Sequence, residues 1–408
     1  MGSIKRKPRL AVVSPFLDKR HGSERIIIEW LSNLPDEFDL HVYSQRVEDF
    51  DESKFTWHRI PKLAGPHLLN FLWWLGANRL WRYWDGRFRS LRHDLVFSAG
   101  ANCLDAAAIC VHIVFAEYTK RVRGGMNFLR NPIWEWARLL HRKLYYRVAV
   151  WMERRAYKNR GTMLVVYSRK TARELEQFYG RTDRIPVLYL GLDHSVFNTT
   201  VRTALREGAR RTLKIPQDQF TLILVGNDWR NKGVPVLLDA LAYLRDLPVG
   251  LLIVSREDQS SCRRLVTEKK LEERVLFLPP RKDIEFYYAA ADAYTGPSLQ
   301  ESYGIPPAEA MACGLPVIVS AAAGVSEIVT NDVDGMVLDD PTDATKLATM
   351  VRRLYEDKEF RKRVGDKASE TARRYTWECN GRDLATVFKE LLRRKAQPAM
   401  QTLRQESR

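Results

Sequence analysis

The chain has 408 residues, of which 45% are hydrophobic, and its formal net charge is +16. This length is too great for one ordinary core and predicts two α/β domains. No run of eighteen uncharged apolar residues occurs, and the N-terminus lacks a signal-peptide apolar core, so we expect neither a transmembrane helix nor secretion. The five cysteines are scattered, which fits the reducing cytoplasm and predicts neither disulfides nor a metal site.

Most of the positive charge lies between residues 61 and 160, which hold 18 Lys and Arg against 6 Asp and Glu. The same interval contains seven of the eleven tryptophans. Interleaved cations and aromatic rings predict an anionic membrane surface as a partner, with the rings at the level of the headgroups. Nucleic acid is the rival interpretation. No RNA-recognition, zinc-finger or basic-zipper pattern supports it, so we expect no nucleic-acid partner.

In the first half of the chain, short apolar runs alternate with helical stretches. Strands are predicted at 9–14, 39–44, 95–98, 107–114 and 163–167, and helices at 23–34 and 133–159. This alternation predicts a parallel sheet with helices on both faces. The long helix repeats apolar residues every three or four positions, at Ile133, Trp136, Leu140, Leu144, Val148 and Met152. We expect this face to pack on the sheet, so the membrane hypothesis depends mainly on residues 66–92.

The second half repeats the alternation after a polar stretch, 198–211, that we interpret as a linker. Strands are predicted at 220–225, 249–255, 275–279, 293–296 and 316–320. The sequence therefore predicts two Rossmann-like, doubly wound α/β domains, 1–198 and 199–376, facing each other across a cleft with their ligand-binding edges. A last helix is expected at 377–395, followed by a frayed polar tail.

The segment from Pro297 to Ser320, PSLQESYGIPPAEAMACGLPVIVS, carries the clearest chemical signal. A loop precedes a helix-forming run and then a short apolar strand. A loop-to-helix junction offers backbone N–H groups and the positive end of a helix dipole, which together bind anions. The carboxylates Glu301 and Glu309 beside such a junction suit hydroxyl groups instead. A phosphate next to hydroxyls describes a nucleotide sugar.

A second motif, from Gly226 to Gly233, follows a predicted strand and opens a helix. Glycine lets the backbone approach a ligand, and Arg230 and Lys232 supply charge for a diphosphate. The spacing is neither a P-loop nor a dinucleotide fingerprint.

Together the two motifs resemble the signature of the retaining GT-B glycosyltransferases of family 4, the group 1 transferases. The resemblance implies transfer of a sugar from a nucleotide-diphosphate donor to an acceptor hydroxyl with retention at the anomeric carbon. It implies that Glu309 accepts hydrogen bonds from the ribose and that Glu301 holds the donor sugar. Lys232, with Arg230, would neutralise the diphosphate. Backbone N–H groups of Ser302, Tyr303 and Gly304 would meet the distal phosphate.

The same resemblance suggests further site residues. Arg281 and Ile284 lie where family members pack the nucleobase, and Gly22 and Ser23, in the loop that begins at His21, would approach the diphosphate or the acceptor. His112, at a strand end, would face the donor sugar; a structural role is the alternative. Asp105 and Glu117 flank His112 and are alternatives for touching the acceptor. Ser168 and Gly191 match other family positions, and the last helix would cross back onto the first domain.

Two D-x-D pairs, Asp49 with Asp51 and Asp332 with Asp334, match the metal motif of the other glycosyltransferase fold. We interpret both as solvated turns and expect no metal and no cofactor beyond the donor substrate. The basic, aromatic interval suggests a lipid-linked or cell-envelope glycan acceptor, as in polysaccharide biosynthesis, and a peripheral position on the inner face of the membrane. A GT-B nucleotide-sugar epimerase and a non-catalytic membrane adaptor remain as alternatives.

Overall fold

The structure, a computed structural model, describes residues 6–19, 22–122 and 132–406 and divides into two compact units. The N-terminal unit comprises Met1–Tyr189 with Trp377–Arg408, and the C-terminal unit comprises Leu190–Thr376. The first unit thus ends at Tyr189 rather than at residue 198, and it includes the last helix.

The N-terminal unit is built on a parallel sheet in the order β5-β3-β1-β6-β7-β8. Its strands are β1 (Arg9–Val13), β3 (Asp39–Ser44), β5 (Thr56–Arg59), β6 (Leu95–Ala99), β7 (Ala108–Cys110) and β8 (Met163–Val165). Two short strands, β2 (Phe16–Leu17) and β4 (Arg46–Val47), pair separately. The doubly wound order reverses direction between β1 and β6, which is where ligands bind in such sheets. β7 ends at Cys110, earlier than predicted, and β5 is an additional edge strand.

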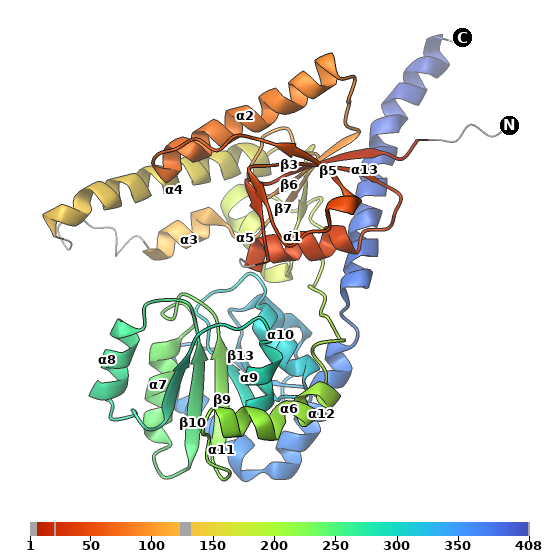
Figure 1. Cartoon of the computed structure of the whole chain (residues 1–408). Helices are drawn as coiled ribbons and strands as arrows, with labels where there is room; N and C mark the ends of the chain where they lie inside the picture. Colours follow the sequence, from red (N-terminus) through yellow and green to blue (C-terminus); the bar gives the residue numbers. More distant parts are fainter. Residues whose placement is uncertain (1–5, 20–21, 123–131, 407–408) are drawn as a thin grey trace. The chain divides into compact units, whose positions relative to one another are not determined.

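Helices cover both faces of this sheet (Figure 1). On one face lie α1 (Gly22–Ser32) and α13 (Trp377–Glu406). The ring of Phe388 in α13 lies 5.3 Å from the ring of Phe97 in β6. On the other face lie α2 (His67–Phe88), α4 (Trp136–Tyr157) and α5 (Arg169–Tyr179), which share one core cluster with β1 and β7. A short helix, α3 (Phe115–Val122), follows β7. No helix among the described residues is long and apolar enough to cross a bilayer.

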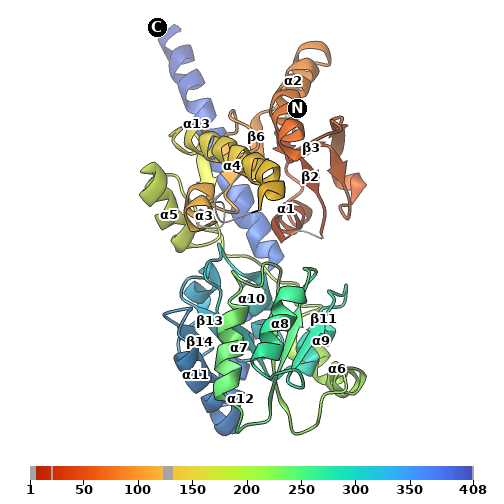
Figure 2. The same ribbon diagram turned by 90° about the vertical axis from the view of Figure 1, so that its left-hand side faces the viewer.

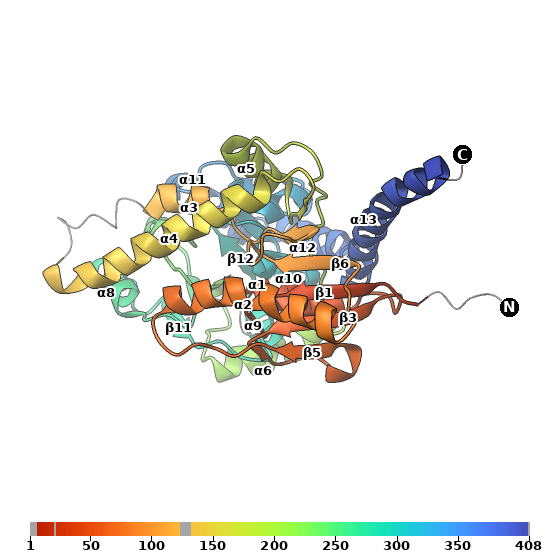
Figure 3. The same cartoon turned by 90° about the horizontal axis from the view of Figure 1, so that it is seen from above.

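Two helices differ from their predicted form. α13 begins at Trp377 as predicted but continues to Glu406, where a frayed tail was expected. The expected apolar face of α4 is wrong over its first half, since Ile133 is 75% and Leu140 52% exposed. Ile133 itself belongs to a 3₁₀ turn, η4 (Ile133–Glu135). The first half of α4 extends beyond the sheet (Figures 1 and 3), and the buried residues of the helix, apart from Leu139, lie in its second half, including Met152.

The C-terminal unit contains a second parallel sheet in the order β11-β10-β9-β12-β13-β14. Its strands are β9 (Phe220–Val225), β10 (Val249–Val254), β11 (Val275–Leu278), β12 (Ala293–Gly296), β13 (Val317–Ser320) and β14 (Met336–Leu338). The order reverses between β9 and β12. β14, only three residues long, is an edge strand that the sequence pattern did not predict.

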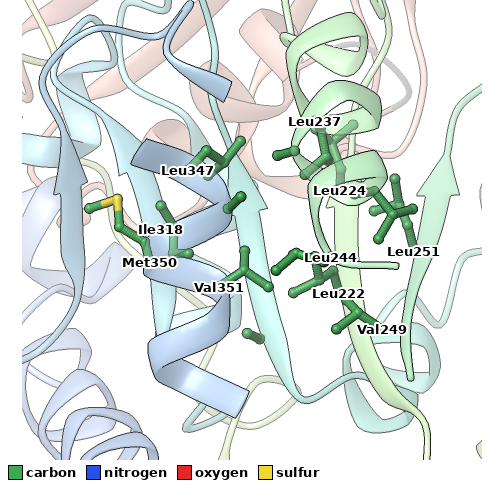
Figure 4. Close-up of a cluster of buried hydrophobic side chains, with 14 of the residues drawn as sticks. Leu222, Leu224, Leu237, Leu244, Val249, Leu251, Ile318, Leu347, Met350 and Val351 are labelled. Atoms are coloured by element: carbon green, nitrogen blue, oxygen red, sulfur yellow. The ribbon is translucent and has the colours of Figure 1, made fainter. Parts of the chain in front are cut away.

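One face of this sheet carries α7 (Val234–Tyr243), α8 (Ser260–Glu268), α11 (Ala344–Glu356) and α12 (Lys358–Ala372). Figure 2 shows α7 and α8 in front of the strands. Leucines of β9 and β10 meet Leu237 of α7 and Val351 of α11 in a continuous core (Figure 4). The other face carries α9 (Glu285–Ala290) and α10 (Ile305–Ala312), with α6 (Thr199–Thr212) packed on α9.

The linker interpretation of residues 198–211 is wrong, because these residues form α6. Asn198 caps the helix by accepting a hydrogen bond from the Val201 amide at 2.8 Å. Arg206 and Arg210 form ion pairs with Asp292 at 2.5 and 3.3 Å, and both also donate to backbone carbonyls at the end of α9. Helix-terminal carbonyls are favourable partners for cations. Two arginines of the polar stretch that we interpreted as a linker therefore hold α6 in place.

Candidate functional site

The two motif loops meet at the point where the C-terminal sheet reverses its strand order. The loop 226–233 leaves the carboxyl end of β9, and the loop 297–304 leaves the carboxyl end of the neighbouring strand β12. In doubly wound sheets, ligands bind outside the carboxyl ends of the strands at this point. The topology alone therefore brings the two predicted motifs together.

An ion pair joins the loops. Lys232 Nζ lies 2.5 Å from Glu301 Oε1, and the two side chains are only 12% and 21% exposed. The lysine chain runs across Gly226, where an added Cβ would lie 2.5 Å from Lys232 Cε. Glycine at position 226 thus leaves room for the lysine to reach Glu301.

Backbone contacts fix the loops against each other. The Leu299 amide donates to the Asn231 carbonyl at 2.7 Å, and Asn231 Nδ2 donates to the Gln300 carbonyl at 2.8 Å. Gly233 has φ +76°, and a Cβ there would lie 2.1 Å from the carbonyl oxygen of Pro297. Both the backbone conformation and the close approach require glycine.

The segment that begins at Glu301 is held along its backbone as well. The Glu301 amide donates to the Ala322 carbonyl, and the Glu301 carbonyl accepts from Gly324, both at 3.1 Å. Ser298 Oγ donates to Glu301 Oε2 at 3.2 Å, so each carboxylate oxygen has a donor. Glu301 is thereby fixed beside the start of α10.

The start of α10 limits which amides an anion can meet. Gly304 precedes the helix with φ +102°, and a Cβ there would be 3.4 Å from the Glu301 carboxyl carbon. Pro306 and Pro307, in the first turn, have no N–H group. The prolines thus remove two amides from the first turn of α10, and the predicted amides of Ser302, Tyr303 and Gly304 lie directly before the helix. The Tyr303 side chain is buried.

Glu309 lies further along α10 and is 3% exposed. Tyr288 of α9 donates a hydrogen bond to Glu309 Oε2 at 2.9 Å. Burial, together with the nearby carboxylate, raises the pKa of Tyr288 well above its usual value, so the hydroxyl stays protonated and donates. Tyr288 fixes the rotamer of Glu309, and sequence reasoning missed it because it lies in an apolar helical stretch without a motif.

The cationic side chains predicted for the phosphates and the base differ in their surroundings. Arg230 is exposed, with its guanidinium carbon 5.1 Å from the centroid of the Trp229 ring. The loop thus directs Lys232, and not Arg230, onto Glu301. Arg281 is also exposed; its hydrogen bond with Asp283 raises its pKa. Ile284 is half-buried and precedes α9, the helix that carries Tyr288.

In the N-terminal unit, His112 follows β7 at the carboxyl edge of the sheet. Its Nδ1 lies 2.5 Å from the hydroxyl of Tyr167, which is also 2.9 Å from Cys110 Sγ. Burial lowers the pKa of His112 to about 4, so the ring is neutral at pH 7. A Tyr167 hydroxyl that donates to Nδ1 places the ring proton on Nε2.

Gly22 and Ser23 form the first turn of α1 rather than a loop, and His21 lies outside the described residues. At Gly22 an added Cβ would meet no atom within 4 Å. The Ser23 hydroxyl donates to Glu24 Oε2 at 2.5 Å. Both residues lie at a helix start, and their approach to a phosphate stays a prediction.

Of the remaining candidates, Asp105 does not flank His112. It precedes β7 and lines a surface hollow with Leu95 and Gly161, at the amino edge of the sheet, whereas His112 lies at the carboxyl edge. Its carboxylate pairs with Arg82 at 2.8 Å. Ser168 is buried and caps α5 by accepting from the Thr171 amide. Glu117 lies in the first turn of α3, and Gly191 at the start of the C-terminal unit.

The two D-x-D pairs have local structural roles. Asp51 caps a 3₁₀ turn, η1 (Glu52–Lys54), and Asp49 accepts from the Lys19 amide at 3.3 Å. Asp332 pairs with Arg353 at 2.8 Å. Asp334 is buried, and not solvated as predicted, because it accepts from the Thr330 amide and from the Thr371 hydroxyl at 2.6 and 2.7 Å.

Comparisons with known proteins bear on this arrangement. The family model "Glycosyl transferases group 1" matches residues 206–371, and "Glycosyltransferase Family 4" matches residues 20–196. A D-inositol 3-phosphate glycosyltransferase of Xylanimonas cellulosilytica is 32% identical over 245 residues, which cover 57% of this chain and 58% of that protein. One from Thermomonospora curvata is 32% identical over 246 residues, covering 55% and 56%. The chain thus spans little more than half the length of these relatives.

Solved structures resemble the whole chain. WaaG, a glycosyltransferase involved in lipopolysaccharide biosynthesis, has a TM-score of 0.74 at 21% identity and covers 93% of this chain and 99% of its own. Anabaena Alr3699/HepE, in complex with UDP-glucose, has a TM-score of 0.71 at 20% identity, covering 94% and 99%. At such identities the likeness establishes the fold alone, which is GT-B with two Rossmann-like domains. The two family matches, which together cover most of the chain, show that it belongs to the group 1 glycosyltransferases of family 4.

Proposed function

We propose that the protein transfers a sugar from a nucleoside-diphosphate sugar to an acceptor hydroxyl with retention of configuration. One observation carries the proposal: Lys232 and Glu301 form an ion pair at the strand reversal of the C-terminal sheet. The cation suits a phosphate, and the carboxylate suits sugar hydroxyls. A diphosphate at the start of α10 lies within the reach of such a lysine, and the attached sugar meets the carboxylate. The UDP-glucose bound by the related fold of HepE supports this class of donor.

In the proposed reaction, the acceptor oxygen bonds to the anomeric carbon while the bond from that carbon to the diphosphate breaks. Positive charge grows on the sugar and negative charge on the departing phosphate. Lys232 and the amides before α10 stabilise the phosphate, and Arg230 adds charge from the exposed side of the loop. The acceptor proton passes to the departing phosphate oxygen. Neutral His112 donates a hydrogen bond to a hydroxyl of the donor sugar.

We further propose that cationic side chains, and no metal, neutralise the diphosphate, since Lys232 already lies in the loop that meets it. Transfer measured with EDTA should equal transfer with Mg²⁺ or Mn²⁺. A requirement for either cation would refute this part.

The activity is tested by a thermal-shift panel of UDP-, GDP-, ADP- and TDP-sugars, followed by mass spectrometry of products formed on lipid extracts. We expect one nucleotide series to stabilise the protein and a glycosylated lipid-linked or envelope-glycan product to appear. Glu301→Ala should abolish transfer but change nucleotide affinity only a few-fold. Full activity in that variant would overturn the assignment.

Two alternatives have distinct outcomes in the same assay. An epimerase would release free nucleotide and a new free sugar without any acceptor. A membrane adaptor that keeps the fold would bind no nucleotide sugar. The Lys232–Glu301 pair favours transfer over the adaptor, because a cation beside a carboxylate at this point suits the diphosphate and the sugar of a donor.

A further inference from the structure

Helix α2 packs Trp74 in the core, yet it exposes several large apolar side chains to solvent and buries three polar ones. Leu80, Trp84 and Phe88 are 54%, 55% and 60% exposed, whereas Asn78, Arg82 and Asp85 are buried. The exposed apolar residues recur at helical spacing on one side and form what we call the α2 face: Leu69, Leu72, Trp73, Leu80, Trp84 and Phe88. A soluble helix normally has the opposite orientation.

The buried polar side chains fix this orientation. Asp85 accepts from the Tyr43 hydroxyl at 2.7 Å and pairs with His58 Nδ1 at 2.9 Å. Arg82 donates to both carboxylate oxygens of Asp105, at 2.9 and 2.8 Å. Rotation of α2 to bury its apolar face would leave these groups without their partners inside the protein, which is costly. The exposure of the α2 face is therefore built into the N-terminal unit.

The charges on α2 are all suited to an anionic surface. Asp85 is the one acidic residue of the helix, and it is buried. Arg79 and Arg87 are exposed between the apolar positions, and the Arg87 guanidinium carbon lies 5.6 Å from the centroid of the Phe88 ring. Arginines beside large apolar and aromatic side chains are typical of helices that lie in the bilayer interface.

We propose that α2 lies in the plane of an anionic lipid bilayer, with the α2 face inserted at the level of the headgroups. A second copy of the chain fits less well, because a symmetric contact would bring the same arginines together. This inference goes beyond the proposed function and does not depend on sugar transfer. Figure 1 shows α2 and α1 on opposite sides of the N-terminal sheet.

The test uses the full chain in co-sedimentation with phosphatidylcholine vesicles, with and without phosphatidylglycerol. We expect recovery with the anionic vesicles only, and less at high salt. The triple variant Leu80→Ser, Trp84→Ser, Phe88→Ser should bind about tenfold or more weakly, since each side chain loses apolar surface that the bilayer covers. Arg79→Gln with Arg87→Gln should remove the preference for anionic vesicles and is less prone to disturb folding.

Matched controls come from the C-terminal unit. Tyr243→Ser removes a side chain that is 61% exposed on α7, and Arg264→Gln removes an exposed cation of α8. Both should bind vesicles as the wild type does. Wild-type binding by both α2 variants would overturn the proposal, as would a dimer, seen by light scattering, that only the triple variant dissociates. Hydrolysis of a soluble donor sugar in the absence of vesicles separates the two proposals, because the α2 variants should leave it unchanged.

Discussion

The two partners of the Lys232–Glu301 pair should contribute differently to the binding of a nucleoside diphosphate without its sugar. Removing Lys232 should weaken this binding, whereas removing Glu301 should not. In the free protein Lys232 is engaged by Glu301 at 2.5 Å. A diphosphate must compete for this lysine. In Glu301→Ala the lysine is released and a negative charge beside the diphosphate disappears, so affinity should be equal or higher.

The converse change, Lys232→Ala, leaves the Glu301 carboxylate facing the diphosphate. Charge-assisted hydrogen bonds are worth about 1.5–3 kcal/mol, which corresponds to a loss of roughly ten- to a hundredfold in affinity. The Lys232 and Glu301 side chains are 12% and 21% exposed, so the pair is neither fully exposed nor fully buried. The loss of unfolding free energy on removing one partner should therefore lie between the small loss at surface pairs and the larger loss at buried pairs. We expect each single variant to lose roughly 1–2 kcal/mol of unfolding free energy.

Isothermal titration calorimetry with the nucleotide selected in the thermal-shift panel measures these affinities. The double variant, Lys232→Ala with Glu301→Ala, completes a thermodynamic cycle whose coupling energy reports the competition between carboxylate and diphosphate. Equal losses of affinity in both single variants would refute the competition. Unchanged binding in Lys232→Ala would remove the lysine from the diphosphate site.

Three further variants probe single contacts. Tyr288→Phe should lower nucleotide affinity, though less than Glu309→Ala does, because the carboxylate remains but loses the donor that fixes it; calorimetry compares the two. Gly233→Ala should lower the unfolding free energy by roughly 2 kcal/mol or more in urea titrations, since its Cβ would lie 2.1 Å from the Pro297 carbonyl oxygen. Burial raises the pKa of Glu153 to about 7, so the folded state holds the proton more tightly than the unfolded chain. This group should therefore contribute less stability as pH rises from about 4.5 to 7, and Glu153→Gln should flatten that slope in urea titrations at several pH values.

A different result would refute each of these three predictions. Tyr288→Phe that binds nucleotide as weakly as Glu309→Ala would mean that the tyrosine contacts the ligand itself. Gly233→Ala with wild-type stability would mean that the loops are less closely packed than described. If Glu153→Gln leaves the slope of unfolding free energy against pH unchanged, other groups cause that slope. The exposed Glu359→Gln is the control.

The site could be predicted from sequence to the extent that it follows from strand order and local motifs. The strands that precede Gly226 and Pro297 were recognisable as apolar runs, and parallel pairing of neighbouring strands brings their loops together. The contact between Tyr288 and Glu309 was not predictable, because it depends on how two helices meet in the folded unit. No spacing along the chain encodes it.

Helices were harder to interpret, because the spacing of apolar residues does not tell whether a helix face is buried in the core or exposed. The apolar repeat of α4 has the period of a core helix, yet its first half extends beyond the sheet and exposes most of its apolar residues. The polar stretch of α6 lacks such a repeat, yet Arg206 and Arg210 hold it through the carboxylate of Asp292. Asp105 and His112 are close in sequence but lie at opposite edges of the sheet, because β7 runs between them.

A crystal structure of the protein with a bound nucleoside diphosphate tests the central claim most directly. The account predicts that the terminal phosphate lies within hydrogen-bond distance, about 3 Å, of Lys232 Nζ and of an amide between Ser302 and Ile305. It also predicts a ribose hydroxyl at Glu309. A diphosphate bound elsewhere, with the Lys232–Glu301 pair undisturbed, would contradict it.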